Sequence, residues 1–123
     1  MMKSYQELEA WKEARVLVKD IYLLTIKLPS EEKFGLISQL RRAAVSVPAN
    51  IAEGIGRNHS KDTLQFLFIA RGSLNELETL LILSLDLDFI SQESIQEIME
   101  RLIRTRKLLI GFINYKSEKS LSN

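Results

Sequence analysis

Residues 41–57 read "RRAAVSVPANIAEGIGR", and this stretch decides how the chain folds. The apolar positions Ala44, Val47 and Ile51 recur at intervals of three and four residues, which predicts a helix with one buried face. Pro48 lies in the middle of that helix, where it has no N–H to donate and frees the carbonyl of Ala44. We therefore expect a helix that is bent at Pro48 and whose freed carbonyl finds another hydrogen-bond donor.

A polar row follows another side of the same helix. At 100° per residue its members fall within about 60° of one another, on a stripe about 120° from the apolar one. Its small polar groups, with one carboxylate between two guanidiniums, differ from an ordinary solvated face rich in Lys and Glu. The row predicts a hydrogen-bonded contact with another helix or subunit, and the alternative is a solvated face with one weak Glu–Arg pair. The expected contact residues are Gln39, Arg42, Ser46, Asn50, Glu53, Arg57, Ser73 and Glu76.

The partner of this row is expected on the third helix, in one of two ways. Gly72 and Ser73 would let another helix approach closely, and Glu76 or Glu78 could meet an arginine of the row. The same groups could pair inside one bundle or between two subunits, and the sequence leaves both arrangements open.

Four long helices account for the chain, because only two prolines and five glycines interrupt it. Ser4, Ser30, Ser60 and Ser91 are the expected starts of these helices, and no segment alternates with the period of a strand. The prediction is an all-α, antiparallel up-down-up-down four-helix bundle. Residues 1–116 would form this single domain and residues 117–123 a polar, disordered tail. The expected core positions of the third helix are Leu64, Leu67, Phe68, Leu74, Leu77 and Leu81.

Composition excludes several classes of protein. The chain has 123 residues, enough for one core, and no cysteine, so disulfides and thiolate chemistry are excluded. Its formal charge of +1 gives no overall coat of positive charge, although local clusters remain. The start of the chain lacks an apolar signal segment, and the longest apolar stretch, residues 77–90, is short and acidic. We expect a cytoplasmic protein without membrane contact.

Recognisable catalytic and metal-binding patterns are missing from the sequence. His59 is the one histidine, so neither a histidine metal site nor a Ser–His pair with a further partner is expected. The glycines of "GIGRNHS" at residues 54–60 follow no strand and precede no Lys-Ser or Lys-Thr pair, so this is no phosphate-binding loop. The sequence predicts no enzyme, cofactor, metal or small-molecule substrate.

Basic residues gather in two clusters that could contact phosphates. The other interpretation of the cluster in the fourth helix is that it complements the helix C-terminus or pairs with Glu97 and Glu100 one turn away. The candidate nucleic-acid-binding residues are Arg41, Arg42, Arg57 and Lys61 in the first cluster and Arg101, Arg104, Arg106 and Lys107 in the second.

Two segments of the chain carry a family resemblance. Residues 28–57 and 66–81 contain the pattern Gln-x-x-Arg, Ser-x-Pro-x-Asn-Ile-Ala-Glu-Gly and then Gly-Ser-x-x-Glu. The chain thereby resembles the four-helix bundle proteins encoded in intervening sequences of bacterial large-subunit ribosomal RNA genes. The matching positions are Gln39, Arg42, Ser46, Pro48, Asn50, Ile51, Ala52, Glu53, Gly54, Gly72, Ser73 and Glu76.

The resemblance implies a bundle that assembles as a ring-shaped homo-oligomer, typically a pentamer. A related branch, the accessory variability protein of diversity-generating retroelements, is a similar barrel that binds nucleic acid and a reverse transcriptase. Two hypotheses follow. In the first, a ring binds RNA or DNA through repeated basic patches and recruits a further protein. In the second, the chain is purely a protein–protein assembly or adaptor module.

Overall fold

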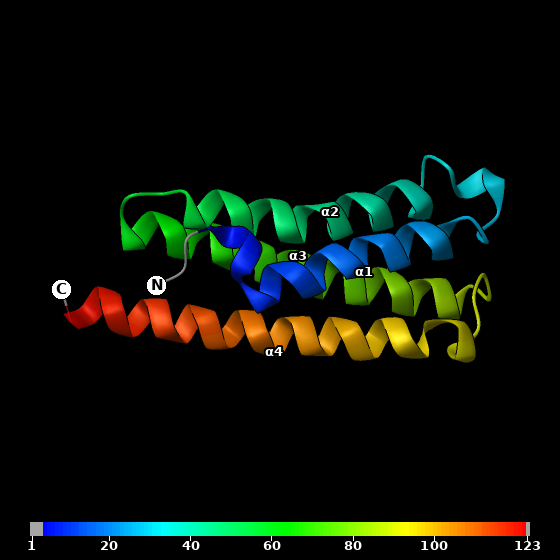
Figure 1. The fold of residues 1–123 in the computed structure, drawn as a ribbon. Helices are drawn as coiled ribbons and strands as arrows, with labels where there is room; N and C mark the ends of the chain where they lie inside the picture. The colour runs from blue at the N-terminus through cyan, green and yellow to red at the C-terminus, as the bar shows by residue number, and fades with distance from the viewer. Residues whose placement is uncertain (1–3, 123) are drawn as a thin grey trace.

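The computed structural model describes the backbone of residues 4–122 and the side chains of residues 4–119. Four α-helices run alternately up and down, and each packs against two neighbours (Figure 1). Residues 4–122 contain no strand, which confirms the predicted all-α four-helix bundle. The elements are η1 (Tyr5–Glu7), α1 (Glu9–Thr25), η2 (Ser30–Glu32), α2 (Leu36–Ile55), α3 (Ser60–Asp86) and α4 (Gln92–Ser122).

The buried faces of the four helices meet in one hydrophobic cluster. Most predicted core positions lie there, because apolar residues three or four apart share one side of a helix. Phe68 is the exception, since its side chain is 43% exposed, and the prediction that it faces the core is wrong. The stripe of α3 passes instead through Leu67, Ala70 and Leu74, all fully buried. Phe68 follows Leu67 directly and is therefore turned about 100° away from that stripe.

Two helices begin later than the serines predict. Ser4 accepts a hydrogen bond from the Gln6 N–H but caps only η1, and α1 starts at Glu9 after the extended residue Leu8. Ser30 opens η2, and α2 starts at Leu36, whose N–H donates to Glu32 Oε1 at 3.1 Å. The Glu32 carboxylate thus satisfies the N-terminus of α2, further along the chain than Ser30 had predicted.

The later helix ends agree more closely with the sequence. α3 starts at Ser60, and α2 ends beside Gly56. Ser91 precedes α4 and exchanges hydrogen bonds with Ser94. α4 continues to Ser122, where the sequence predicted a disordered tail from residue 117. α2 is helical through Pro48, so the proline does not end the helix, and the bend there stays a prediction.

α2 and α3 approach most closely at Gly54. A Cβ placed on Gly54 would lie 3.0 Å from the Thr63 carbonyl oxygen and 3.0 Å from Phe66 Cβ. The Thr63 hydroxyl donates to the Gly54 carbonyl oxygen at 2.8 Å, so the contact is also hydrogen-bonded. A Cβ placed on Gly72 would meet no other described element within 4 Å. The prediction that another helix of the same chain approaches closely at Gly72 is therefore wrong.

These two glycines give opposite predictions for substitution by alanine. Gly54→Ala forces α2 and α3 apart against backbone atoms and should lower the free energy of unfolding by about 1–3 kcal/mol. Gly72→Ala meets open space in an exposed part of α3 and should raise it by about 0.5–1 kcal/mol. Urea unfolding followed by circular dichroism measures both changes. Equal effects of the two substitutions would show that the Gly54 contact does not limit helix packing.

Candidate functional site

A pair of serines joins α2 to α3 at the centre of the predicted polar row, and an asparagine of α2 bonds to one of them. The Ser46 and Ser73 hydroxyl oxygens lie 2.8 Å apart, and either can donate. Asn50 Nδ2 donates to the Ser46 carbonyl oxygen at 2.8 Å and to Ser46 Oγ at 2.9 Å. Ser73 is buried, while Ser46 and Asn50 are half-buried. This part of the row therefore makes the expected hydrogen-bonded contact, and it does so within one chain.

None of these hydrogen bonds reaches the backbone carbonyl that Pro48 leaves without its helical donor. A proline cannot donate to the carbonyl four residues earlier, which is that of Ala44. The Asn50 amide group donates to Ser46, and the Ser46 hydroxyl pairs with Ser73. The hydrogen bonds of Ser46 and Asn50 in the described residues therefore do not serve the Ala44 carbonyl, and of the two only the Ser46 hydroxyl links α2 to α3.

The outer members of the row remain at the surface. Glu53 and Arg57 form an exposed ion pair at 3.4 Å one helical turn apart, which is the weak surface pair of the alternative interpretation. The Arg57 guanidinium also lies 4.7 Å from the centre of the Phe66 ring. These two residues are thus solvated and held by their own chain.

A shallow open hollow lies beside the Ser46–Ser73 contact. Gln39, Arg42 and Glu76 line it together with Ala43 and Ser46. The ion pairs within residues 4–119 include neither Arg42 nor Glu76, and both side chains are exposed. The structure therefore brings four predicted contact residues together and leaves two opposite charges there without a salt bridge.

The basic cluster of α4 is largely occupied by carboxylates of other helices. Arg101 donates to Glu13 at 2.7 Å and to Asp20 at 3.0 Å, both on α1. Arg104 reaches Glu13 at 3.2 Å. Pairing with Glu97 and Glu100 was the wrong assignment, because the partners lie on the neighbouring helix.

Arg106 of α4 reaches the opposite neighbour. It pairs with Glu78 of α3 at 2.9 Å and donates to Asn75 at 3.2 Å. Glu78 therefore pairs with Arg106. The sequence had allowed Arg42 or Arg57 as its partner, and neither forms an ion pair with it.

Three basic candidates remain. Arg41 donates to Thr25 Oγ1 at 2.9 Å and lies 4.6 Å from the Tyr22 ring centre, so it is tied to α1. Lys61 and Lys107 are exposed, and no ion pair within residues 4–119 involves them.

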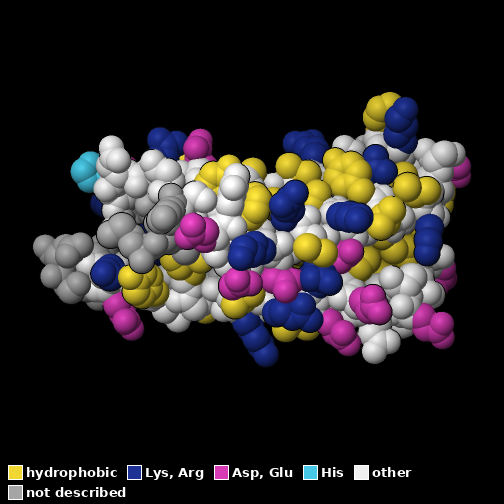
Figure 2. Space-filling view, in the orientation of Figure 1, with side chains coloured by type: hydrophobic (Ala, Val, Ile, Leu, Met, Phe, Trp, Pro, Cys, Tyr) yellow, Lys and Arg dark blue, Asp and Glu magenta, His cyan; other side chains and the backbone are white. Residues whose placement is uncertain are grey.

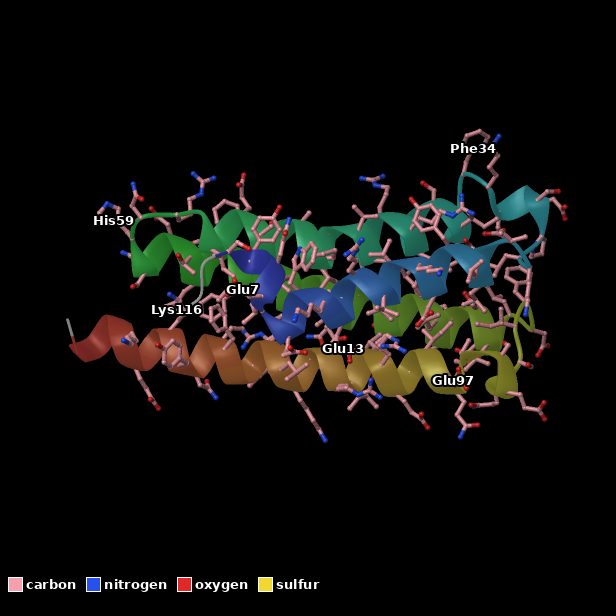
Figure 3. All side chains as sticks on the ribbon, viewed as in Figure 1. Glu7, Glu13, Phe34, His59, Glu97 and Lys116 are labelled. Atoms are coloured by element: carbon pink, nitrogen blue, oxygen red, sulfur yellow. The ribbon has the colours of Figure 1, made fainter. Side chains whose placement is uncertain are left out.

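Glu13 is the carboxylate most affected by this network, and it lies between α1 and α4 (Figure 3). Burial opposes its ionisation, but hydrogen bonds from Arg101 and Arg104 outweigh burial and hold the pKa of Glu13 below its ordinary value. Burial likewise opposes the charge of Arg101, and its bonds to Glu13 and the charge of Asp20 outweigh it, which raises the pKa of Arg101. Both groups are therefore more firmly ionised in the folded bundle.

The sequence analysis did not predict a third basic group, which lies on α1. Lys12, Arg15 and Lys19 are exposed and line an open hollow with Val16 between them. Their spacing of three and then four residues is the signal that could have found them, because it places all three on one helix face.

The described residues show no other chemical centre. Within residues 4–119 no three His, Cys, Asp or Glu side chains are grouped to hold a metal ion. His59 is exposed and makes no capping hydrogen bond to α3. None of the helices described has the length and apolar character needed to cross a membrane.

Comparison with known proteins identifies relatives of this bundle. Residues 6–111 match the family described as 23S rRNA-intervening sequence protein. A crystal structure from Bacteroides thetaiotaomicron, of a protein with unknown function from the S23 ribosomal protein family, is 28% identical and superimposes with a TM-score of 0.78. The alignment covers 85% of this chain and 97% of that chain. A search of curated proteins found no match. These findings confirm the resemblance seen in residues 28–57 and 66–81.

The Glu13 network predicts a dependence of stability on pH. Because the native pKa of Glu13 lies below the ordinary value of 4.5, the unfolded chain binds a proton more readily than the folded one. The stabilisation is therefore present above pH 4.5 and is lost as the pH falls from there through the native pKa. Glu13→Gln should flatten this part of the stability curve, measured by urea unfolding at a series of pH values.

Glu97→Gln is the matched control, since Glu97 is an exposed carboxylate on α4, away from Glu13 (Figure 3). Its stability curve should parallel that of the unchanged protein. A Glu13→Gln curve that also stays parallel would refute the stabilising role of the α1–α4 ion pairs.

Proposed function

The chain belongs to the 23S rRNA-intervening sequence protein family, and from this premise we propose that it is a non-catalytic subunit that assembles into a ring-shaped homo-oligomer and binds nucleic acid. The family is not a known enzyme family, and the similar crystal structure from the S23 ribosomal protein family superimposes on the four-helix fold described above. The proposal has an assembly part and a nucleic-acid part, which different surfaces of the bundle support.

The outer face of α3 beside α2 is the observation that carries the assembly part. Ile69, Glu76 and Leu83 are seven residues apart, so they lie on one side of α3. Ile69 and Leu83 are exposed, and Glu76 shares the surface hollow with Arg42. Apolar side chains flanking charges without ion pairs are typical of a surface that becomes buried against a partner.

The ring form of the assembly rests on the family resemblance, and the α2–α3 face would supply one of the two faces that a ring needs. A closed ring needs a heterologous interface, in which one face of each subunit meets a different face of the next. The α2–α3 face carries Arg42 and Glu76, which form no ion pair within the described part of the chain and are exposed to a neighbouring subunit. A pentamer, as the family resemblance implies, would bury five copies of this contact.

The nucleic-acid part rests on basic side chains that lack carboxylate partners. Arg15, Lys19, Lys61 and Lys107 are exposed, and no ion pair in the described part of the chain includes them. Repetition around a ring multiplies such modest contacts, because each further contact is made within an already formed complex. Phosphate binding of this kind has little sequence preference and weakens with salt.

A pure assembly module is the competing function, and the α4 cluster favours it. Arg101, Arg104 and Arg106 make up most of the basic cluster that the sequence predicted on α4, and all three are engaged by carboxylates of the same chain. Under this alternative the oligomer forms and no nucleic acid binds. Oligomeric mass and nucleic-acid binding therefore have to be measured separately.

The assembly part predicts that Leu83→Glu dissociates the oligomer, because it places a carboxylate in the buried contact. Light scattering coupled to size exclusion should give a multiple of 14.1 kDa for the unchanged protein and a smaller mass for this variant. Ile82→Glu is the matched control, since Ile82 is 45% exposed against 43% for Leu83. As the preceding residue, it is turned about 100° away from Leu83 around α3. An unchanged protein that is monomeric, or equal masses for both variants, would exclude this interface.

The nucleic-acid part predicts salt-dependent binding of single-stranded RNA or DNA. Fluorescence anisotropy with a labelled oligonucleotide of about 20 nucleotides should show affinity falling by at least tenfold between about 50 and 200 mM salt. The dissociated Leu83→Glu variant should bind at least tenfold more weakly, because it no longer has multivalency. No binding at micromolar oligomer would leave the assembly module as the function.

A further inference from the structure

We propose that the outward face of α1, around Lys12, Arg15 and Lys19, is the surface that binds single-stranded nucleic acid. This inference rests on the proposed function and assigns its nucleic-acid part to a surface outside both sequence-predicted clusters. Three features support it: the charges of α1, the ion pairs that α1 makes with α4, and the aromatic rings beside it.

The three basic residues form one uninterrupted row. They follow one another at three and four residues, and all are exposed. Lys12 has a weak, exposed pair with Glu9 at 3.4 Å, whereas no ion pair in the described part of the chain involves Arg15 or Lys19. Figure 2 shows Lys and Arg side chains spread across the face on which α1 lies.

Two of the three carboxylates of α1 are neutralised by α4, and the third, Glu9, is paired with Lys12. Glu13 and Asp20 lie close to the basic positions in the sequence, and both are paired with Arg101. Arg104 adds a second positive charge at Glu13. The same ion pairs that occupy the α4 arginines therefore leave the outer row of α1 with a net positive charge.

Aromatic rings lie beside the row, and arginines cover them. The Arg15 guanidinium lies 5.6 Å from the Trp11 ring centre, and the Arg41 guanidinium lies 4.6 Å from the Tyr22 ring centre. A guanidinium that stacks on a ring has its plane fixed, and its other face can stack on a nucleobase. Tyr22 is also 41% exposed, which leaves part of its own ring open.

Single-stranded nucleic acid is the partner that this combination fits. A positive row that follows the backbone, with planar groups on which bases stack, is the usual construction of single-strand-binding surfaces. A duplex hides its base faces and would use only the charges. Val16 and Leu23 add exposed apolar area to α1, so an anionic lipid surface is the competing partner that the test must include.

The α1 face is separate from the α3 face that carries the assembly part of the proposal. The backbone of α1 packs closely against α2 and α4 but not against α3, whose outer face carries the assembly part of the proposal. Binding at α1 therefore leaves the Ile69–Leu83 face free, and one strand could pass from subunit to subunit.

The test compares two variants in the full chain. One replaces Lys12, Arg15 and Lys19 with alanine, and the control replaces Lys33 and Arg71, which are exposed cations outside the α1 row and outside both predicted basic clusters. Anisotropy is measured with labelled single-stranded RNA, single-stranded DNA of the same sequence and the corresponding duplex. Light scattering and circular dichroism confirm that both variants keep the fold and the oligomer.

The α1 variant should bind single strands at least tenfold more weakly, and the slope of log K against log salt should fall by about 0.7 for each phosphate that the protein no longer neutralises. The control should change affinity by less than about threefold. Tyr22→Leu should weaken single-strand binding by severalfold without changing the salt slope, because it removes stacking and leaves the charges.

Other outcomes overturn the proposal in distinguishable ways. If the unchanged protein binds oligonucleotides and only the control variant binds more weakly, the α1 assignment is wrong and the proposed function stands. If the unchanged protein binds no oligonucleotide, the nucleic-acid part of the function fails as well. Equal or tighter binding of the duplex refutes the single-strand preference. Sedimentation with phosphatidylglycerol vesicles that is abolished in the α1 variant, with oligonucleotide binding intact, assigns the face to a membrane surface.

Discussion

The close approach of α2 and α3 is the constraint on which the rest of the structure depends. A Cβ on Gly54 would lie only 3.0 Å from the Thr63 carbonyl oxygen, and a hydrogen bond from the Thr63 hydroxyl holds the two helices there in addition to apolar contact. The Ser46–Ser73 pair and the Asn50 amide group satisfy polar groups that would otherwise be costly to bury there. This fixed pair of helices sets the positions of Arg42 and Glu76, and with them the surface hollow on the outside of the bundle.

The spacing of apolar residues predicted the helices well because burial repeats with the helical turn. It did not predict the exposed side chain of Phe68 or the residues at which α1 and α2 start. Phe68 has the chemistry of a core residue, but α3 turns the small Ala70 inward, where it is fully buried. The starts of α1 and α2 shifted because Leu8 is extended and Glu32 caps Leu36 from within η2. Such choices depend on neighbouring helices, which a single segment does not reveal.

The candidate site was predictable only where its contacts are local. The Glu53–Arg57 pair lies one helical turn apart and could be read directly from the sequence. Arg101 and its partner Glu13 lie on helices at opposite ends of the chain, so helical spacing pointed to Glu97 and Glu100 instead. The sequence likewise grouped Ser46 with Ser73 but could not say whether one chain or two would supply them.

Charge balance links these observations to binding. A chain with a formal charge of +1 can still present a positive face, provided that its carboxylates are paired away from that face. α4 does this for α1, since Arg101 and Arg104 lie against Glu13 and Asp20, and no described ion pair involves the outward Arg15 or Lys19. The sequence predicted Arg101 and Arg104 as phosphate-binding residues. In the structure they instead neutralise carboxylates of α1 and so make the surface potential of that helix more positive. Net charge and clustering along the chain miss this arrangement, because it exists only once α1 and α4 are packed together.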